Sequence, residues 1–205
     1  MNESFIKKPI LIVIAGPNGS GKTSITNKIL EHEWVEECVY INPDNIARDT
    51  FGDWNSLDAV MKAAKLATQN REDCISKGES LIFETVLSAD DKIDFIQKAK
   101  DKGYFIRLFF VGTESPIINA SRIAQRVMEG GHDVPITKII SRYGKSIANC
   151  CVASKIVNRA YIYDNSVDFE DPKLLFRVID GNITKQYDYI NDWANPILEF
   201  IKNEK

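Results

Sequence analysis

The chain alternates between two kinds of hydrophobic pattern. Short continuous runs of β-branched and aromatic residues predict strands, which lie at 9–16, 38–42, 80–88, 104–112, 160–165 and 174–182. Between them, apolar residues recur at every third or fourth position, which predicts helices at 23–34, 56–78, 90–103, 115–129, 136–158 and 187–202. Strands that alternate with helices of this length form βαβ units. The pattern therefore predicts an α/β fold with a mostly parallel sheet of about five to six strands.

One segment departs from this alternation. Two helices follow each other between the fourth and fifth strands, and the sequence GGHDVP joins them at 130–135. We expect a single domain over residues 1–205, with a helical lid inserted at approximately 115–158.

Composition narrows the class of protein. The 205 residues are 44% hydrophobic, enough for one sizeable core, and the net charge of −3 gives no overall positive field. We therefore expect no nucleic-acid partner, although a local basic patch remains compatible with that charge. The first apolar run, at 9–14, is too short for a membrane span or for the core of a signal peptide. We expect no membrane association and a cytoplasmic location.

The cysteines give no sign of a metal site. Cys38, Cys74, Cys150 and Cys151 show neither CxxC nor Cys/His ligand spacing. We interpret all four as reduced and structural.

A glycine-rich segment interrupts the pattern directly after the first strand. Residues 16–24 read GPNGSGKTS and contain the motif GxxxxGK[ST] between a strand and a helix. Glycines let consecutive backbone N–H groups turn toward one anion, and the next helix offers the positive end of its dipole. Lys22 would reach the outer phosphates, and the Thr23 hydroxyl would ligate Mg²⁺. The segment therefore predicts a three-layer P-loop NTPase or kinase fold that binds ATP and Mg²⁺. The predicted cofactor-binding residues are Gly16, Pro17, Asn18, Gly19, Ser20, Gly21, Lys22, Thr23 and Ser24.

Two carboxylates follow strands at the same edge of the predicted sheet. Asp44 comes just after the second strand, where it could accept a proton from an attacking hydroxyl; the structural alternative is a helix cap. Glu84 ends the third strand, and it could serve Mg²⁺, bind the hydroxyls of an acceptor, or cap a helix. Asp49 and Asp53 lie further from the strand end and are weaker candidates for the base.

Arginines of the predicted lid form a third group. Arg122 and Arg126 are spaced i, i+4 on the polar side of the helix at 115–129, which suits clamping of transferring phosphates. The structural alternative is a solvated basic face. Arg142 in the next helix is a further candidate, and the glycines at 130–131 would supply hinge freedom.

The aromatic residues of the strands and the segments that end the late strands need no functional role to explain them. The aromatic side chains of the strands are assigned to the core, with no role in stacking on bases; they include Phe105, Phe109, Phe110, Tyr161, Tyr163 and Phe176. The segments YDNS at 163–166 and DGN at 180–182 end late strands and could flank an adenine at the same sheet edge, although turn chemistry also explains them.

Taken in order, these motifs resemble the zeta-toxin family of P-loop kinases and, more loosely, chloramphenicol phosphotransferase. The resemblance rests on GPNGSGKTS, NPD, FETVLS and the segment RIAQRVMEGGHDVP followed by SRY, and it spans roughly residues 9–182. It implies that Lys22 and Thr23 bind ATP and Mg²⁺ and that Asp44 is the catalytic base toward a sugar hydroxyl.

The same resemblance implies that Glu84 helps to bind the acceptor and that Arg126 stabilises the transferred phosphate. An acceptor of the family is UDP-N-acetylglucosamine. The chain departs from the toxin pattern in its lid, where GGHDVP places His132 or Asp133 near the position of a second lid arginine. Arg122 or Arg142 would have to substitute for that arginine.

We expect an ATP-dependent phosphotransferase that moves the γ-phosphate to a hydroxyl of a small molecule. The alternative is an ATP-binding regulatory module with slow ATPase activity and no small-molecule acceptor. A kinase acting on RNA ends is disfavoured by the acidic composition. A possible antitoxin protein is not evident from the sequence.

Overall fold

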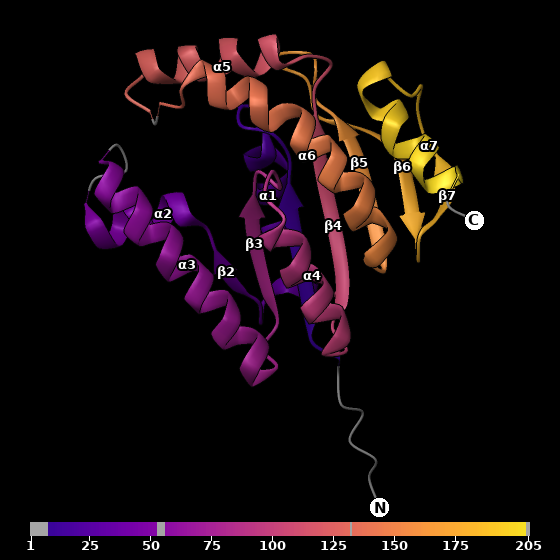
Figure 1. Ribbon diagram of the computed structural model, residues 1–205, viewed down its shortest axis with the longest axis horizontal. Coiled ribbons are helices and arrows are strands. Elements are labelled where there is room, and N and C mark those ends of the chain that lie inside the picture. Colours follow the sequence, from indigo (N-terminus) through magenta and orange to yellow (C-terminus); the bar gives the residue numbers. More distant parts are fainter. Residues whose placement is uncertain (1–7, 53–55, 132, 204–205) are drawn as a thin grey trace, which may run out of the picture.

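A mixed sheet forms the centre of the computed structural model, which describes residues 8–52, 56–131 and 133–203 (Figure 1). The strands of the described chain are β1 (Ile10–Ala15), β2 (Val39–Ile41), β3 (Leu81–Thr85), β4 (Phe105–Gly112), β5 (Arg159–Asp164), β6 (Lys173–Ile179) and β7 (Asn182–Gln186). Their spatial order is β2-β3-β1-β4-β5-β6-β7, with parallel pairing from β2 to β5 and antiparallel pairing of β6 and β7. The predicted α/β fold and mostly parallel sheet are confirmed, and the described residues form seven strands in place of the expected five to six.

Helices connect the strands much as the pattern predicts. They are α1 (Lys22–Leu30), α2 (Pro43–Phe51), α3 (Leu57–Lys77), α4 (Asp91–Asp101), α5 (Pro116–Met128), α6 (Ile136–Ile156) and α7 (Asn195–Asn203), with short 3₁₀ turns at Glu33–Val35 and Asp192–Ala194.

Two elements were missed and one was misplaced. Helix α2 is short and begins at Pro43, a residue type that is favoured at the first position of a helix. Strand β7 lies at the sheet edge with all five of its residues exposed or half-exposed, so it shows no alternation of buried apolar residues. The final helix begins at Asn195 rather than 187, because the residues before it form β7, a loop and a 3₁₀ turn.

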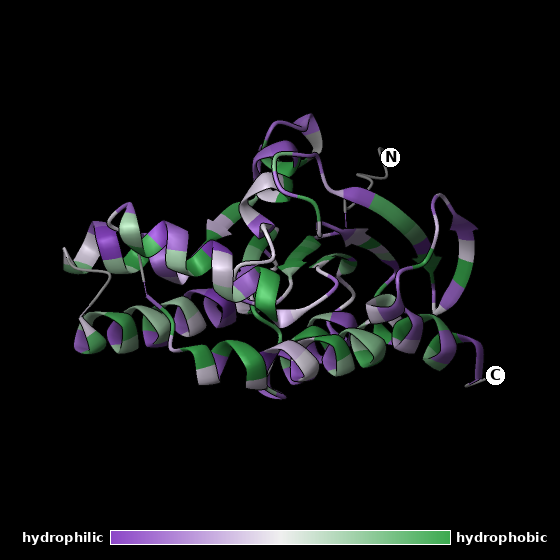
Figure 2. Cartoon of the chain, turned by 90° about the horizontal axis from the view of Figure 1, so that it is seen from above, coloured by the Kyte–Doolittle hydropathy of each residue, from purple (hydrophilic) through white to green (hydrophobic). Residues whose placement is uncertain are grey.

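The two faces of the sheet are covered unequally. Buried residues of α3, α4, α6 and α7 pack with the strands in one large cluster on one face. On the other face, the described helix that contributes core residues is α1, through Ile25 and Ile29, with Val35 of the 3₁₀ turn beside it. The view from above shows the long helical layer along one side of the sheet and a smaller covering on the opposite side (Figure 2).

This asymmetry changes the interpretation of the strand aromatics. Phe109, Phe110 and Phe176 are buried as expected, whereas Phe105, Tyr161 and Tyr163 are only half-buried. The latter three lie on the face that α1 covers in part. Their assignment to the core was therefore only partly right.

Two further findings bear on the class of protein. All four cysteines carry free thiols, as expected, and burial raises the pKa of the Cys150 thiol well above its usual value. Among the described helices, none is both long and apolar enough to cross a membrane.

Candidate functional site

The glycine-rich segment forms a tight loop between β1 and α1. Gly19 and Gly21 have φ angles of 76° and 87°, in the left-handed region that favours glycine. A Cβ on Gly19 would lie 2.5 Å from the carbonyl oxygen of Asn119, and one on Gly21 would lie 2.1 Å from Nδ2 of Asn165. Both the backbone conformation and the crowding therefore require glycine, and the loop packs against Asn119 of α5 and Asn165 of the segment between β5 and β6.

Lys22 closes this loop from inside. Its Nζ donates to the carbonyl oxygens of Gly16 at 2.9 Å and Pro17 at 3.0 Å. Desolvation lowers the pKa of Lys22 to about 8, while Glu84 and Asp44 oppose that shift and Arg126 adds to it. An ammonium held among carbonyl oxygens at the start of a helix is ready to exchange these partners for phosphate oxygens. The loop and Lys22 thus fit a polyphosphate.

Thr23 is the next residue and is exposed at the second position of α1. Its hydroxyl is the group that would hold Mg²⁺ beside the phosphates.

The predicted carboxylates lie in a row beside the loop. Because β2, β3 and β1 are parallel neighbours, their carboxyl ends meet at one edge of the sheet. Glu84 lies near the end of β3, paired in register with Ile14 of β1, and Asp44 lies in the first turn of α2, directly after β2. Both influence the charge of Lys22. The three groups therefore belong to one electrostatic site.

Asn42, and not Asp44, is the N-cap residue of α2. Oδ1 of Asn42 accepts hydrogen bonds from the backbone N–H of Asp44 at 2.8 Å and of Asn45 at 3.4 Å, and so caps α2. The Asp44 side chain is exposed. Its carboxylate is therefore not used as the N-cap.

Glu84 is surrounded by hydroxyl groups that were not predicted. Its Oε1 accepts hydrogen bonds from Tyr40 Oη at 2.6 Å and from Thr26 Oγ1 at 2.9 Å, and Asn42 Nδ2 donates to Tyr40 Oη at 3.1 Å. Burial and the bond to Glu84 raise the pKa of Tyr40 above its ordinary value. A sequence signal existed for these residues, since Tyr40 and Asn42 alternate along the strand that leads to Asp44, and Thr26 lies one helical turn after Lys22.

The helical pair α5–α6 lies above this edge of the sheet (Figure 1). Its three candidate arginines have different surroundings. Arg126 is in the last turn of α5, where its Cγ is so near Gly131 that a Cβ there would approach it to 2.5 Å. It lies close enough to Lys22 to lower the pKa of that amine. Arg142 of α6 reaches the P-loop, with Nη1 donating to Asn18 Oδ1 at 3.5 Å.

Arg122 binds the segment between β5 and β6. Its guanidinium donates to the backbone oxygen of Asn165 at 2.8 Å and to Asp168 at 2.7 Å, both in the segment between β5 and β6. Of the two candidates for a second lid arginine, Arg142 is the one in contact with the P-loop.

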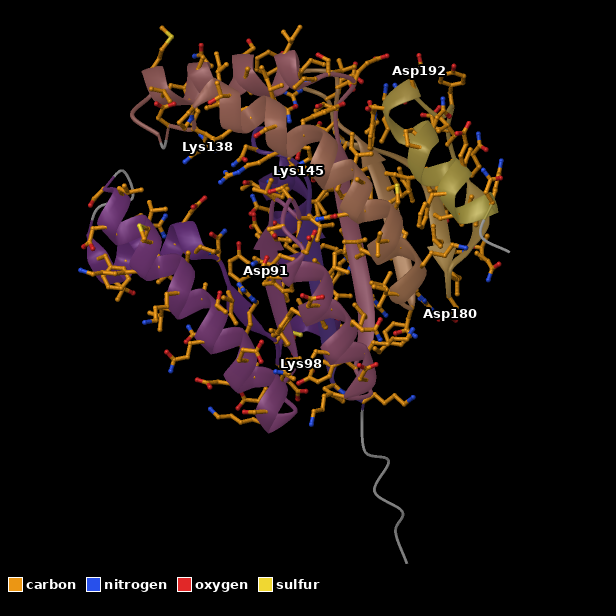
Figure 3. All side chains as sticks on the ribbon, in the orientation of Figure 1. Asp91, Lys98, Lys138, Lys145, Asp180 and Asp192 are labelled. Atoms are coloured by element: carbon orange, nitrogen blue, oxygen red, sulfur yellow. The ribbon has the colours of Figure 1, made fainter. Side chains whose placement is uncertain are left out.

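The segment 163–166 approaches the P-loop, but 180–182 does not. Because β6 runs antiparallel to β5, the turn after β6 lies at the opposite edge of the sheet from the P-loop, and our placement of DGN was wrong. Figure 3 shows Asp180 at that far end, while Asp192 lies near the other. Asp53 and His132, which the sequence raised as minor candidates, are outside the described residues.

Comparison with known proteins identifies the family of this chain. The model of the Zeta toxin family matches residues 2–169, more than half of the chain. The chain belongs to the Zeta toxin family. An uncharacterized protein of Haemophilus influenzae is 28% identical over 132 residues, which cover 64% of this chain and 91% of that protein.

Two solved structures show how far the fold is shared. The structure from the PezAT toxin–antitoxin system of Streptococcus pneumoniae has a TM-score of 0.63 at 18% identity, covering 96% of this chain and 86% of its own. The AvrRxo1-ORF1:-ORF2 structure with ATP has a TM-score of 0.67 at 19% identity, covering 97% of this chain and 65% of its own. At these identities the likeness shows the fold alone, which is the three-layer α/β fold that the motifs predicted.

Proposed function

We propose that this zeta-toxin-family protein is an ATP-dependent phosphotransferase that moves the γ-phosphate of ATP to a hydroxyl of a small molecule. The observation that carries the proposal is that two carboxylates and an arginine lie near Lys22. Asp44, Glu84 and Arg126 come from three separate elements, and each lies near enough to the P-loop amine to shift its pKa: Glu84 and Asp44 raise it, and Arg126 lowers it together with burial. Lys22 would contact the outer phosphates of ATP, so a carboxylate and an arginine near this amine would lie where transfer to an acceptor needs a base and a clamp.

In this proposal Asp44 is the general base. Its carboxylate accepts the proton of the acceptor hydroxyl while the hydroxyl oxygen attacks the γ-phosphorus, the bond from that phosphorus to the β–γ bridging oxygen breaks, and ADP leaves. Since Asn42 caps α2, the Asp44 side chain is available for this role. Lys22 neutralises charge on the phosphates, and Thr23 would hold Mg²⁺, which supplies further neutralisation.

Glu84 would position the acceptor. Its Oε1 already accepts from Tyr40 and Thr26, so the network presents oxygen atoms suited to a polyhydroxyl ligand. The family resemblance favours a nucleotide sugar such as UDP-N-acetylglucosamine.

The α5–α6 pair would act as the lid of a single kinase domain. Arg126 and Arg142 are the proposed clamps on the transferred phosphate, because one influences Lys22 and the other contacts Asn18 of the P-loop. Closure would exclude water and so favour transfer to the acceptor over hydrolysis. The toxin–antitoxin system of the pneumococcal neighbour makes a protein antitoxin a reasonable partner to test.

The experiment is a screen for acceptor-dependent release of ADP. Purified protein, ATP and Mg²⁺ are incubated with a panel of nucleotide sugars and other hydroxyl-bearing metabolites. Asp44→Asn should lower turnover by roughly 10²–10⁴-fold. Asp49→Asn is the matched control, because Asp49 lies on the same helix and is exposed like Asp44, but it is paired with Arg48.

Three outcomes are decisive. Turnover that requires an acceptor and is lost in Asp44→Asn supports the kinase. Slow ATPase that no acceptor stimulates and that Asp44→Asn leaves unchanged would favour the regulatory module. Equal losses in both aspartate variants would remove Asp44 from the role of base.

A further inference from the structure

A cavity lies on the face of the sheet that α1 covers, and none of the P-loop residues 16–24 lines it. Its volume is about 380 Å³, and it lies between Ile25 and Lys28 of α1 and the strand residues Arg107, Phe109 and Tyr161. Cavities that bind small molecules have volumes from about 300 to 1,000 Å³. The cavity is therefore large enough for a small ligand.

The floor of the cavity is aromatic. Phe109 and Tyr161 are paired in register on neighbouring strands, and their rings are stacked with centroids 4.8 Å apart and planes 9° from parallel. Tyr161 remains half-buried, and Tyr163 also lines the cavity. Rings in this arrangement offer a surface on which a further flat ring can stack.

The cavity is also cationic. Lys28 and Arg107 line it, and Arg159 lies opposite Arg107 on the neighbouring strand. The two guanidiniums share the Phe105 ring, at 5.4 Å and 5.5 Å from its centroid. Like charges on directly opposite residues destabilise a sheet, so an anion bound between them would relieve repulsion. Lys28 forms an ion pair with Asp171 at 2.8 Å, but both side chains are more than half exposed, so that pair can exchange.

This cavity is distinct from the site of the proposed kinase. Lys28 lies six residues after Lys22, which is about 9 Å along the helix axis. Arg107 is the third residue of β4, far from the carboxyl end where Asp44, Glu84 and the P-loop meet. The inference therefore does not depend on the proposed activity.

We propose that this cavity binds a planar aromatic ring that carries an anionic group, the chemistry of a nucleotide, either free or as one unit of a single strand. The ring would extend the Phe109–Tyr161 stack, and its phosphate would contact Lys28 and Arg107, with Arg159 on the neighbouring strand adding to the positive charge. The expectation of no nucleic-acid partner rested on net charge, which does not describe this local basic and aromatic face.

The test measures binding of AMP and of an eight-residue adenylate RNA by isothermal titration calorimetry. Each titration is repeated with Lys22→Ala, so that binding at the P-loop is recognised by its loss in that variant. Tyr161→Ala should weaken binding by about tenfold or more, whereas Tyr161→Phe keeps the ring and should bind as the unsubstituted protein does. Lys28→Gln should weaken binding several-fold. Lys173→Gln is its matched control, because Lys173 is an equally exposed lysine in an ion pair with Glu170 and does not line the cavity.

The outcomes distinguish the source of the ligand. Binding of AMP that falls in Tyr161→Ala and Lys28→Gln supports a free nucleotide, and binding of the RNA alone with the same losses supports a strand. Binding of neither probe overturns the proposal. Equal binding by Lys28→Gln and Lys173→Gln also overturns it, and this comparison remains available if Tyr161→Ala does not fold. Binding lost only in Lys22→Ala would place the probe in the P-loop and overturn it as well.

Discussion

Nδ2 of Asn165 donates a hydrogen bond of 2.8 Å to the carbonyl oxygen of Ser20, and so ties the end of β5 to the P-loop. The same side chain occupies the space where a Cβ on Gly21 would lie. Arg122 extends the connection to α5 by binding the backbone oxygen of Asn165. The P-loop is thus positioned by groups more than a hundred residues later in the chain.

Loss of this bond should weaken ATP binding. Asn165→Ala removes one hydrogen bond worth about 0.5–1.5 kcal/mol and loosens the loop, so we expect the Kd for ATP to rise by about three- to tenfold. Calorimetric titration measures it. Asn182→Ala is the control, since Asn182 donates to Asp180 in the turn at the opposite edge of the sheet. Similar losses in both variants would show that Asn165 acts only through general stability.

Two glycines should respond to alanine in opposite directions. Gly19 has a positive φ, and its Cβ would meet the Asn119 carbonyl at 2.5 Å, so Gly19→Ala should destabilise the fold by more than about 1 kcal/mol. Gly144 lies within α6, with no atom near its Cβ position, so Gly144→Ala should stabilise by about 0.5–1 kcal/mol. Urea unfolding of the nucleotide-free protein measures both free energies. A neutral Gly19→Ala would contradict the packing of the P-loop against α5.

The P-loop could be located from sequence, whereas its supports could not. The motif GxxxxGK[ST] depends on local backbone chemistry, and it stands between a strand and a helix as the pattern requires. Asn119 and Asn165 contact the loop only because β4 lies beside β1 in the sheet and β5 lies beside β4. No spacing along the chain encodes that proximity. For the same reason, the antiparallel direction of β6 was not foreseen, and the turn at 180–182 was placed at the wrong edge.

Arg122 and Arg142 should differ in kinetic effect. Arg142 contacts the P-loop, so Arg142→Gln should lower kcat by about a hundredfold or more if it clamps the transferred phosphate. Arg122 binds the 165–168 segment, so Arg122→Gln should act mainly on ATP affinity. Steady-state kinetics with the acceptor identified by the screen separates kcat from KM. A larger loss of kcat in Arg122→Gln would reverse the assignment.

Tyr40 should affect the acceptor more than ATP. Tyr40→Phe removes the 2.6 Å hydrogen bond to Glu84 but keeps the ring, so the acceptor KM should rise by about three- to tenfold with the ATP KM nearly unchanged. Tyr104→Phe is the control, because that hydroxyl bonds to the Cys74 and Glu79 carbonyls, away from the carboxylate row. A rise in the ATP KM alone would place Tyr40 and Glu84 on the nucleotide side of the site.

The affinity for ATP should depend on pH through Lys22. Its pKa is lowered to about 8 in the nucleotide-free protein, chiefly by desolvation, and bound phosphates favour the charged amine. Below pH 8 the amine is already protonated, so the affinity should be nearly constant. Above pH 8 binding requires proton uptake, and the Kd should rise toward tenfold per pH unit, because the terminal phosphate of ATP is fully ionised there.

The same shift predicts a stability effect of definite sign. The unfolded chain has a Lys22 pKa near 10.5 and binds more protons than the native state between pH 8 and 10.5, so this group increases the free energy of unfolding as pH rises through that window. The binding prediction is tested by calorimetric titration of ATP at pH 7 and pH 9. Buffers of different ionisation enthalpy report the proton uptake on binding. Lys22→Arg, whose guanidinium stays charged, should remove the pH dependence of the Kd even where it weakens binding. A slope that persists in Lys22→Arg would assign the titration to another group.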